Sequence, residues 1–231
     1  MLKNEISANY AEVKEKISNV CRRIGIDENN ITIVAITKTH TIDVVKTVID
    51  CGIKDVGESR IQEAETKIET VRKLGVNYHF VGHLQSNKVR KAVEMFDLIH
   101  SVDSVKIAKV ISDESKKAGR RMKLLLQLNC SGEASKSGFQ PDEIVDTAGE
   151  ISEFEGIEIK GIMTIGPWVE DEGMIRDDFR MTKKKFDEVK SKFPKLALEY
   201  LSMGMSGDYQ IAIEEGANMI RLGTVLFGHR S

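Results

Sequence analysis

The feature that most constrains the fold of this chain is a regular alternation between short apolar runs and longer amphipathic stretches. Amphipathic stretches at 60–74 and 104–118 carry apolar residues at helical spacing, and a further helix is expected at 4–24. Alternation of this kind is typical of parallel strands that are joined by helical crossovers. The expected strands, rich in β-branched residues, are 31–38, 53–59, 78–82, 98–102, 122–129, 157–166, 196–204 and 219–228.

Eight such units close naturally into a barrel of about 250 residues, and this chain has 231. We therefore predict an α/β fold, a single (β/α)8 TIM barrel with an extra N-terminal helix, in which residues 1–231 form one domain. A doubly wound open sheet is the alternative. No G-x-G-x-x-G follows the first run, which weakens a dinucleotide-binding version of that sheet.

Composition excludes several classes of partner. The net charge is -2, whereas a nucleic-acid-binding protein would usually show a strong basic excess. No apolar stretch approaches the roughly 18 residues of a membrane span, and the charged N-terminus does not resemble a signal peptide. The three cysteines, Cys21, Cys51 and Cys130, show neither C-x-x-C pairing nor zinc-site spacing. We expect a reduced, cytoplasmic protein without a metal site.

In barrels of this type the functional site lies at the carboxyl ends of the strands. The seventh run continues into "MGMSGD" and the eighth contains "RLGT", so both combine glycine with a hydroxyl residue. Glycine lets a backbone N–H approach a ligand, and Ser or Thr adds a hydroxyl donor. Loops after strands 7 and 8 often bind phosphate. A phosphate cup of Ser206, Gly207, Gly223 and Thr224 is therefore one interpretation, and ordinary turns are the other.

Lys38 ends the first run, and it shares a strand face with Val34 and Ile36. If that face points into the barrel, burial favours the neutral amine, which is the nucleophile that forms Schiff bases. A lysine that reaches solvent from a strand end is the alternative. Arg221 stays charged and either faces the same ligand or forms a salt bridge within the barrel. A lysine, a phosphate cup and an arginine together fit pyridoxal 5′-phosphate (PLP).

Seven segments of the chain also resemble a known family. They are "AITKTH", "GESRIQEA", "HFVGHLQSNK", "NCSGEASKSGF", "GIMTIGP", "LSMGMSGDY" and "IRLGTVLFG". Together they resemble the YggS/PROSC family of PLP-binding homeostasis proteins, over about residues 30–229. The resemblance implies a barrel of the alanine racemase N-terminal type. It also implies that Lys38 forms the internal aldimine with PLP and that Arg221 faces the pyridine nitrogen.

The resemblance extends to further site residues. Met203 and His83 match residues that line the cofactor ring, and Asn87 and Lys88 fall in the "LQSNK" motif at the mouth of the site. Ser59 stands where many relatives have asparagine, so a cofactor contact at that position is open. The residues that match the family's phosphate site are Ser206, Gly207, Gly223 and Thr224.

The implied function is intracellular PLP homeostasis rather than turnover. An arginine opposite the pyridine nitrogen keeps that nitrogen unprotonated, which makes the ring a poorer electron sink. Alanine racemase uses a tyrosine from a second domain as its opposite base, and this sequence ends at Ser231 without a matching one. We expect a monomer that supplies PLP to apoenzymes. A PLP-dependent racemase and a sugar- or nucleotide-phosphate enzyme are the alternatives, and Lys136 is either a solvated loop residue or a transient second attachment point.

Overall fold

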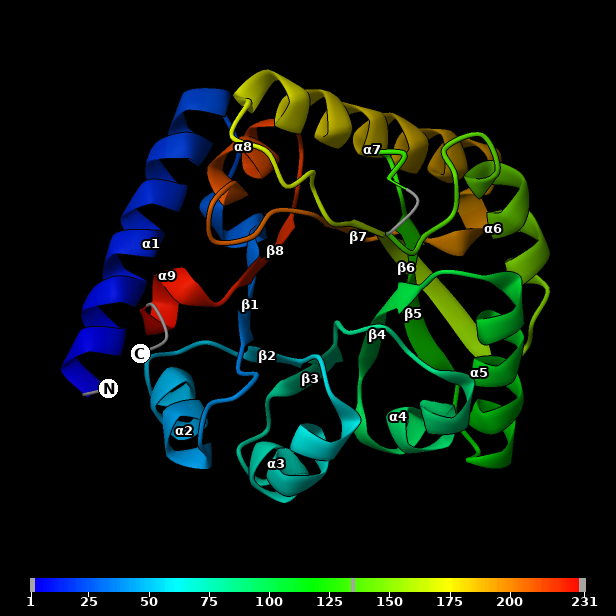
Figure 1. Ribbon diagram of the computed structural model, residues 1–231, viewed down its shortest axis with the longest axis horizontal. Helices are drawn as coiled ribbons and strands as arrows, with labels where there is room; N and C mark the ends of the chain where they lie inside the picture. The colour runs from blue at the N-terminus through cyan, green and yellow to red at the C-terminus, as the bar shows by residue number, and fades with distance from the viewer. Residues whose placement is uncertain (1–2, 134–135, 229–231) are drawn as a thin grey trace.

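Eight parallel strands form a closed barrel in the computed structural model, which describes residues 3–133 and 136–228 (Figure 1). Each strand pairs with the next in sequence, and β1 pairs with β8 to close the barrel. The predicted TIM barrel is therefore confirmed, and an open sheet is excluded. The strands are β1 (Thr32–Ile36), β2 (Asp55–Glu58), β3 (Asn77–Phe80), β4 (Leu98–Val102), β5 (Met122–Leu128), β6 (Ile157–Thr164), β7 (Tyr200–Ser202) and β8 (Met219–Leu222).

Helices surround the barrel, because each crossover has one apolar stripe that it buries against the strands. Figure 1 shows α1 on the left of the barrel, alongside α8 and α9, and α7 running across the top. The predicted N-terminal helix is α1. The helices are α1 (Lys3–Ile24), α2 (Ile42–Asp50), α3 (Ile61–Lys73), α4 (Val89–Met95), α5 (Val105–Lys117), α6 (Ile144–Ser152), α7 (Glu172–Lys192), α8 (Tyr209–Glu214) and α9 (Thr224–Phe227).

Apolar side chains form a tightly packed cluster inside the barrel. Their alternation along each strand puts one set inside and the other against the helices. In β8, Met219 belongs to the inner cluster, so Arg221, two residues later, faces the same interior. The inner cluster consists of Val34, Leu98, Leu125, Met163 and Met219.

Seven of the eight strands are shorter than their apolar runs, and the difference is largest for β7 and β8. The run 219–228 is strand only to Leu222, and its second half is the helix α9, whose Leu226 and Phe227 are buried. The Leu226 carbonyl accepts a hydrogen bond from Asn9 of α1 at 3.0 Å. The run 196–204 forms strand only at Tyr200–Ser202. A short apolar run does not by itself distinguish a strand from a buried helical turn, which explains both differences.

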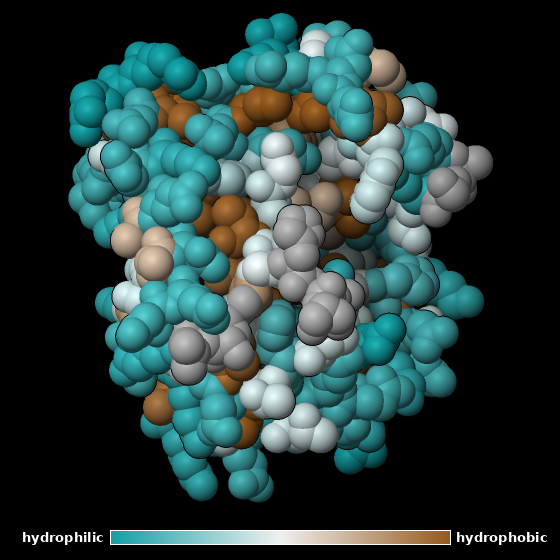
Figure 2. Space-filling model, turned by 60° about the vertical axis from the view of Figure 1, so that its left-hand side comes forward, coloured by the Kyte–Doolittle hydropathy of each residue, from teal (hydrophilic) through white to brown (hydrophobic). Residues whose placement is uncertain are grey.

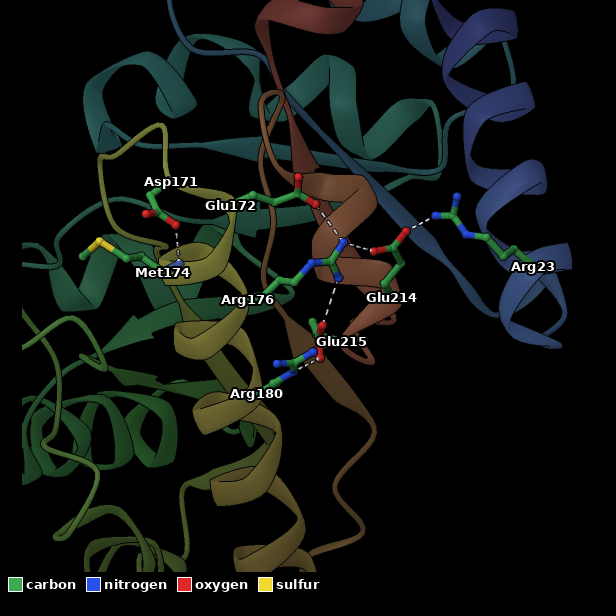
Figure 3. Close-up of polar contacts among 8 residues, drawn as sticks. All are labelled: Arg23, Asp171, Glu172, Met174, Arg176, Arg180, Glu214 and Glu215. Carbon is green, nitrogen blue, oxygen red and sulfur yellow. Dashed lines mark hydrogen bonds and ion pairs between the residues drawn. The ribbon is translucent and has the colours of Figure 1, made fainter.

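Ion pairs on the outside of the barrel hold α8 between α7 and α1 (Figure 3). Arg176 of α7 contacts Glu214 and lies 3.0 Å from Glu215, both at the end of α8. Glu214 in turn pairs with Arg23 of α1, and Glu215 accepts from Arg180 at 2.9 Å. Networks of several charges are more effective than isolated surface pairs. This network fixes the helix that follows the loop after β7.

One face of the molecule, drawn in Figure 2, is mostly hydrophilic. Figure 2 shows charged and polar residues over most of one face, with hydrophobic residues in recesses between them. Within the part of the chain that the structure describes, no helix has both the length and the apolar character that crossing a membrane requires.

Candidate functional site

A cavity of about 380 Å³ opens at the carboxyl ends of β1 and β8, beside the loop that follows β7. Parallel strands place their carboxyl ends at one rim, so segments that are far apart in sequence meet there. Six of the predicted site residues line this cavity: Lys38, Ser206, Gly207, Arg221, Gly223 and Thr224. The lining also includes Ile36, His40, Trp168, Met205, Phe227 and Gly228.

Ser206 joins the two halves of the phosphate cup. Its hydroxyl oxygen accepts hydrogen bonds from the backbone N–H groups of Gly223 and Val225, both at 3.2 Å. Since the oxygen accepts twice, its own proton remains available to a ligand. Gly204, with φ +92, makes the turn after β7, and a side chain there would meet Ala212 Cβ at 2.6 Å.

Backbone donors in the cup are available to an anion. Within the described residues, the N–H groups of Ser206, Gly207 and Thr224 make no hydrogen bond to the protein. A Cβ atom at Gly207 would meet nothing within 4 Å, so open space lies beside that residue. Three free N–H groups and two hydroxyls around one cavity are the kind of donor set that phosphate oxygens accept from. The donors of the predicted phosphate cup are therefore chemically suited to a phosphate group.

Arg221 lies at the floor of the cavity and is 5% exposed. Its guanidinium donates to the Ser202 carbonyl at 2.8 Å, to the Ser202 hydroxyl at 2.7 Å and to the Thr164 carbonyl at 2.7 Å. Burial lowers the pKa of Arg221 to about 10, and the carboxylate of Asp208 opposes that effect. The group stays charged at neutral pH. No carboxylate pairs with it directly among the described residues, so the predicted alternative of a salt bridge is wrong.

Lys38 lines the same cavity, but its side chain is exposed. Val34 lies in the inner cluster and Ile36 packs against it, as expected for the inward face. The strand ends at Ile36, however, and Thr39 has a positive φ of 66° that turns the chain outward. The expectation that the barrel buries the Lys38 side chain is therefore wrong, and the alternative of a lysine that reaches solvent from the strand end fits its exposure. The lysine reaches the cavity from its rim rather than from the barrel interior.

A buried cluster anchors the segment that carries Lys38. Thr37 donates to Glu58 Oε1 at 2.8 Å, and Lys67 Nζ lies 2.5 Å from the same oxygen. Lys67 also donates to the Thr37 carbonyl at 2.8 Å. Burial raises the pKa of Glu58, and the ammonium of Lys67 opposes that rise. On the other side of Lys38, the N–H of Thr39 donates to Glu63 at 2.6 Å. Both neighbours of Lys38 are therefore held by hydrogen bonds.

Three predicted site residues do not line this cavity. Met203 is fully buried, and Met205 occupies the lining instead. Ser59 is half-buried, with its carbonyl packed against Gly82. His83 is exposed, lies 3.2 Å from Asp103 and lines a separate cavity of about 230 Å³. The predicted cofactor contacts of Met203, Ser59 and His83 are therefore not seen in the geometry of this cavity.

Other residues at the rim have local partners. Lys136 lines the cavity that contains His83, donates to the Gly166 carbonyl at 3.1 Å and pairs with Glu133 at 2.8 Å. Asn87 and Lys88 lie in a short 3-10 helix, Ser86–Lys88, outside both cavities. Sequence reasoning missed Trp168, which is 94% exposed at the edge of the Lys38 cavity. The single tryptophan of the sequence, in the segment between β6 and α7, was the available signal.

Comparisons with known proteins agree with this geometry. The family model of the alanine racemase N-terminal domain matches residues 5–231. The pyridoxal phosphate homeostasis protein of Aquifex aeolicus is 36% identical over 220 residues, which cover 95% of this chain and 96% of that protein. The Escherichia coli K12 protein of the same name is 36% identical over 231 residues, covering 98% and 97%.

A solved structure supports the same assignment. PipY of Synechococcus elongatus PCC7942, determined with PLP bound, superimposes with a TM-score of 0.84 at 32% identity. The match covers 96% of this chain and 100% of PipY. Near full-length matches at this identity, to relatives with the same barrel, establish common membership. The chain therefore belongs to the pyridoxal phosphate homeostasis protein family, within the alanine racemase N-terminal domain fold.

Proposed function

We propose that this protein binds PLP covalently through Lys38, shields the reactive aldehyde and releases the cofactor to apoenzymes. The observation that carries the proposal is one cavity that combines Lys38, the phosphate cup and buried Arg221. Relatives bearing the name pyridoxal phosphate homeostasis protein, and a PLP-bound relative, support it. PLP supplies an aldehyde that condenses with amines and a ring that stabilises negative charge.

The residues present fit this cofactor. The free N–H groups of Ser206, Gly207 and Thr224 would hold the phosphate, together with the hydroxyls of Ser206 and Thr224. Arg221 would donate to the ring nitrogen, since a guanidinium donates and does not accept. Lys38 would form a carbon–nitrogen double bond with the aldehyde carbon, while the aldehyde oxygen leaves as water with the two amine hydrogens. Exposure of Lys38 at the rim leaves this bond accessible for release.

The surroundings of the cavity support storage rather than turnover. Arg221 would hold the ring nitrogen of bound PLP unprotonated, which would weaken the ring as an electron sink. A racemase needs a proton-transferring group on each face of its substrate. No tyrosine is among the described residues that line the cavity; Tyr78 and Tyr209, for example, are buried elsewhere. The lining therefore lacks the tyrosine base that the racemase alternative requires.

Transfer and turnover can be measured on one preparation. The PLP-loaded protein is mixed with the apo-form of a PLP-dependent enzyme, and recovered enzyme activity is followed against free PLP at equal concentration. We expect activity to recover from the loaded protein. In parallel, the loaded protein is incubated with single enantiomers of several amino acids. Steady racemisation or transamination would contradict the storage function and favour the enzyme alternative. A protein that takes up no PLP would favour a sugar- or nucleotide-phosphate ligand.

A further inference from the structure

A continuous chain of hydrogen bonds crosses the barrel interior from one end to the other. Arg221 of β8 donates to the Ser202 hydroxyl of β7 at 2.7 Å, and that oxygen lies 3.2 Å from His100 Nδ1 on β4. His100 Nε2 lies 2.9 Å from His79 Nδ1 on β3, and His79 Nε2 lies 3.0 Å from Asp55 Oδ1 on β2. We call these five residues the lumen chain.

The lumen chain has a direction. Burial holds the pKa of His100 well below its ordinary value, so this imidazole is neutral. The Asp55 carboxylate can only accept, so His79 donates to it from Nε2. With one proton on each imidazole, His79 Nδ1 then accepts from His100 Nε2, and His100 Nδ1 accepts from the Ser202 hydroxyl, whose oxygen accepts from Arg221. Every hydrogen bond points from the guanidinium toward the carboxylate.

The two ends of the lumen chain lie at opposite ends of the barrel. Arg221 lines the cavity with Lys38, whereas Asp55 lines a different cavity of about 330 Å³ together with Thr32 at the start of β1. Between them, His79, His100 and Ser202 are at most 3% exposed. Burying polar groups is costly unless each has a partner. Barrel interiors are normally filled by branched apolar residues, so filling space does not require these side chains.

The orientation of the Arg221 guanidinium depends on how firmly its hydrogen-bond acceptors are held. Its direct acceptors, the Ser202 carbonyl, the Ser202 hydroxyl and the Thr164 carbonyl, are all neutral. A buried cation with neutral partners keeps its orientation only if those partners are themselves fixed. The Ser202 hydroxyl is fixed by His100, and the negative end of the lumen chain is the Asp55 carboxylate.

We propose that Ser202, His100, His79 and Asp55 are positioning residues for Arg221, which hold its guanidinium in one orientation toward the ring nitrogen of PLP. The inference rests on the proposed function, because it assumes that PLP occupies the Lys38 cavity. Its consequence is that a change at Asp55, at the far end of the barrel, alters PLP binding and the electronic state of the bound ring.

The test uses Ser202→Ala, Asp55→Ala and Asp55→Asn in the full-length protein. Asp97→Asn is the matched control, because Asp97 accepts from the Tyr78 N–H at 2.8 Å near the same barrel end but lies outside the lumen chain. PLP affinity is measured by quenching of Trp168, the only tryptophan of the sequence, and the visible spectrum of the bound cofactor is recorded across pH. Thermal unfolding checks that each variant is folded.

We expect Ser202→Ala and Asp55→Ala to weaken PLP binding about tenfold, roughly 1.4 kcal/mol, and to shift the visible spectrum. Asp55→Asn keeps an acceptor for His79, so it is expected to recover most of the affinity that Asp55→Ala loses. Asp97→Asn is expected to match the wild type. In an Arg221→Met background, Ser202→Ala should cause no further loss, because it acts through the guanidinium.

The inference is overturned if Ser202→Ala binds PLP with wild-type affinity and spectrum, or if it weakens binding equally in the Arg221→Met background. Lowered thermal stability without a spectral change would also overturn it, since that result indicates a purely structural role. In each case the wild type still binds PLP, and the proposed function stands. A wild type that fails to bind PLP would instead refute the proposed function, and the inference with it.

Discussion

Asp178 offers a sharp test of the packing described for α7. The residue is 7% exposed, and within the described part of the chain neither carboxyl oxygen has a hydrogen-bond partner. Burial raises the pKa of this carboxyl from 3.8 to about 6, opposed by the charge of Lys136 and reinforced by Glu133 and Asp208. The folded protein therefore retains a proton that the unfolded chain releases between about pH 4 and pH 6.

The size of the effect follows from that pKa. Each pKa unit is worth about 1.4 kcal/mol, so a rise from 3.8 to about 6 costs the folded state about 3 kcal/mol once the carboxyl is ionised. Because the folded-state pKa is raised, this cost is absent below about pH 4, grows as pH rises and is complete above about pH 6. Asp178→Asn stays uncharged at every pH. Its stability relative to the wild type should therefore increase by up to about 3 kcal/mol between pH 4 and pH 7.

Urea unfolding of both proteins at half-unit pH steps measures this difference. Asp177→Asn is the matched control, because Asp177 is the adjacent residue of α7 and its side chain is 81% exposed. We expect that control to follow the wild type at every pH. A gap between Asp178→Asn and the wild type that does not change with pH would refute the reasoning, whatever its size.

Two further predictions concern the cofactor site. Thr37→Val removes the hydroxyl that donates to Glu58. It should lower the free energy of unfolding in urea by about 1–3 kcal/mol. It should also weaken PLP binding, because the segment that carries Lys38 is held less firmly. Thr37→Ser should restore both, and unchanged PLP affinity in Thr37→Val would contradict the anchoring role. Ser206→Ala removes the acceptor of two backbone N–H groups and should weaken PLP binding about tenfold by Trp168 quenching. Pyridoxal, which lacks the phosphate, should bind the wild type and Ser206→Ala with equal affinity. If Ser206→Ala lost as much affinity for pyridoxal as for PLP, the phosphate cup would be refuted.

Much of the fold and part of the site were predictable from sequence. The spacing of eight apolar runs is a property of the chain itself, and barrel closure brings the loops after β7 and β8 together. For this reason Ser206 and Gly223, far apart in sequence, lie within hydrogen-bonding distance. The sequence left open whether Lys38 is buried or exposed, because the answer depends on where β1 ends and on the positive φ of Thr39.

The buried polar groups were harder to predict, because each lies inside an apolar pattern. Lys67 falls on the buried stripe of α3, where a solvated lysine was the ordinary expectation, and its partner Glu58 comes from another element. His79 and His100 sit within apolar strand runs, and their contact depends on the register between β3 and β4. A charged or titratable residue on an otherwise apolar stripe was the available signal, but its partner is defined only by the three-dimensional structure.

The central claim is that Lys38 is the attachment point of PLP. Its most direct measurement is borohydride reduction of the protein after incubation with PLP, followed by proteolysis and mass spectrometry of the labelled peptides. The account predicts one dominant label on Lys38, with loss of the visible absorption in Lys38→Ala but not in Lys46→Ala, a control at an exposed lysine of α2. Labelling of Lys136 or other lysines, with Lys38 unmodified, would contradict it.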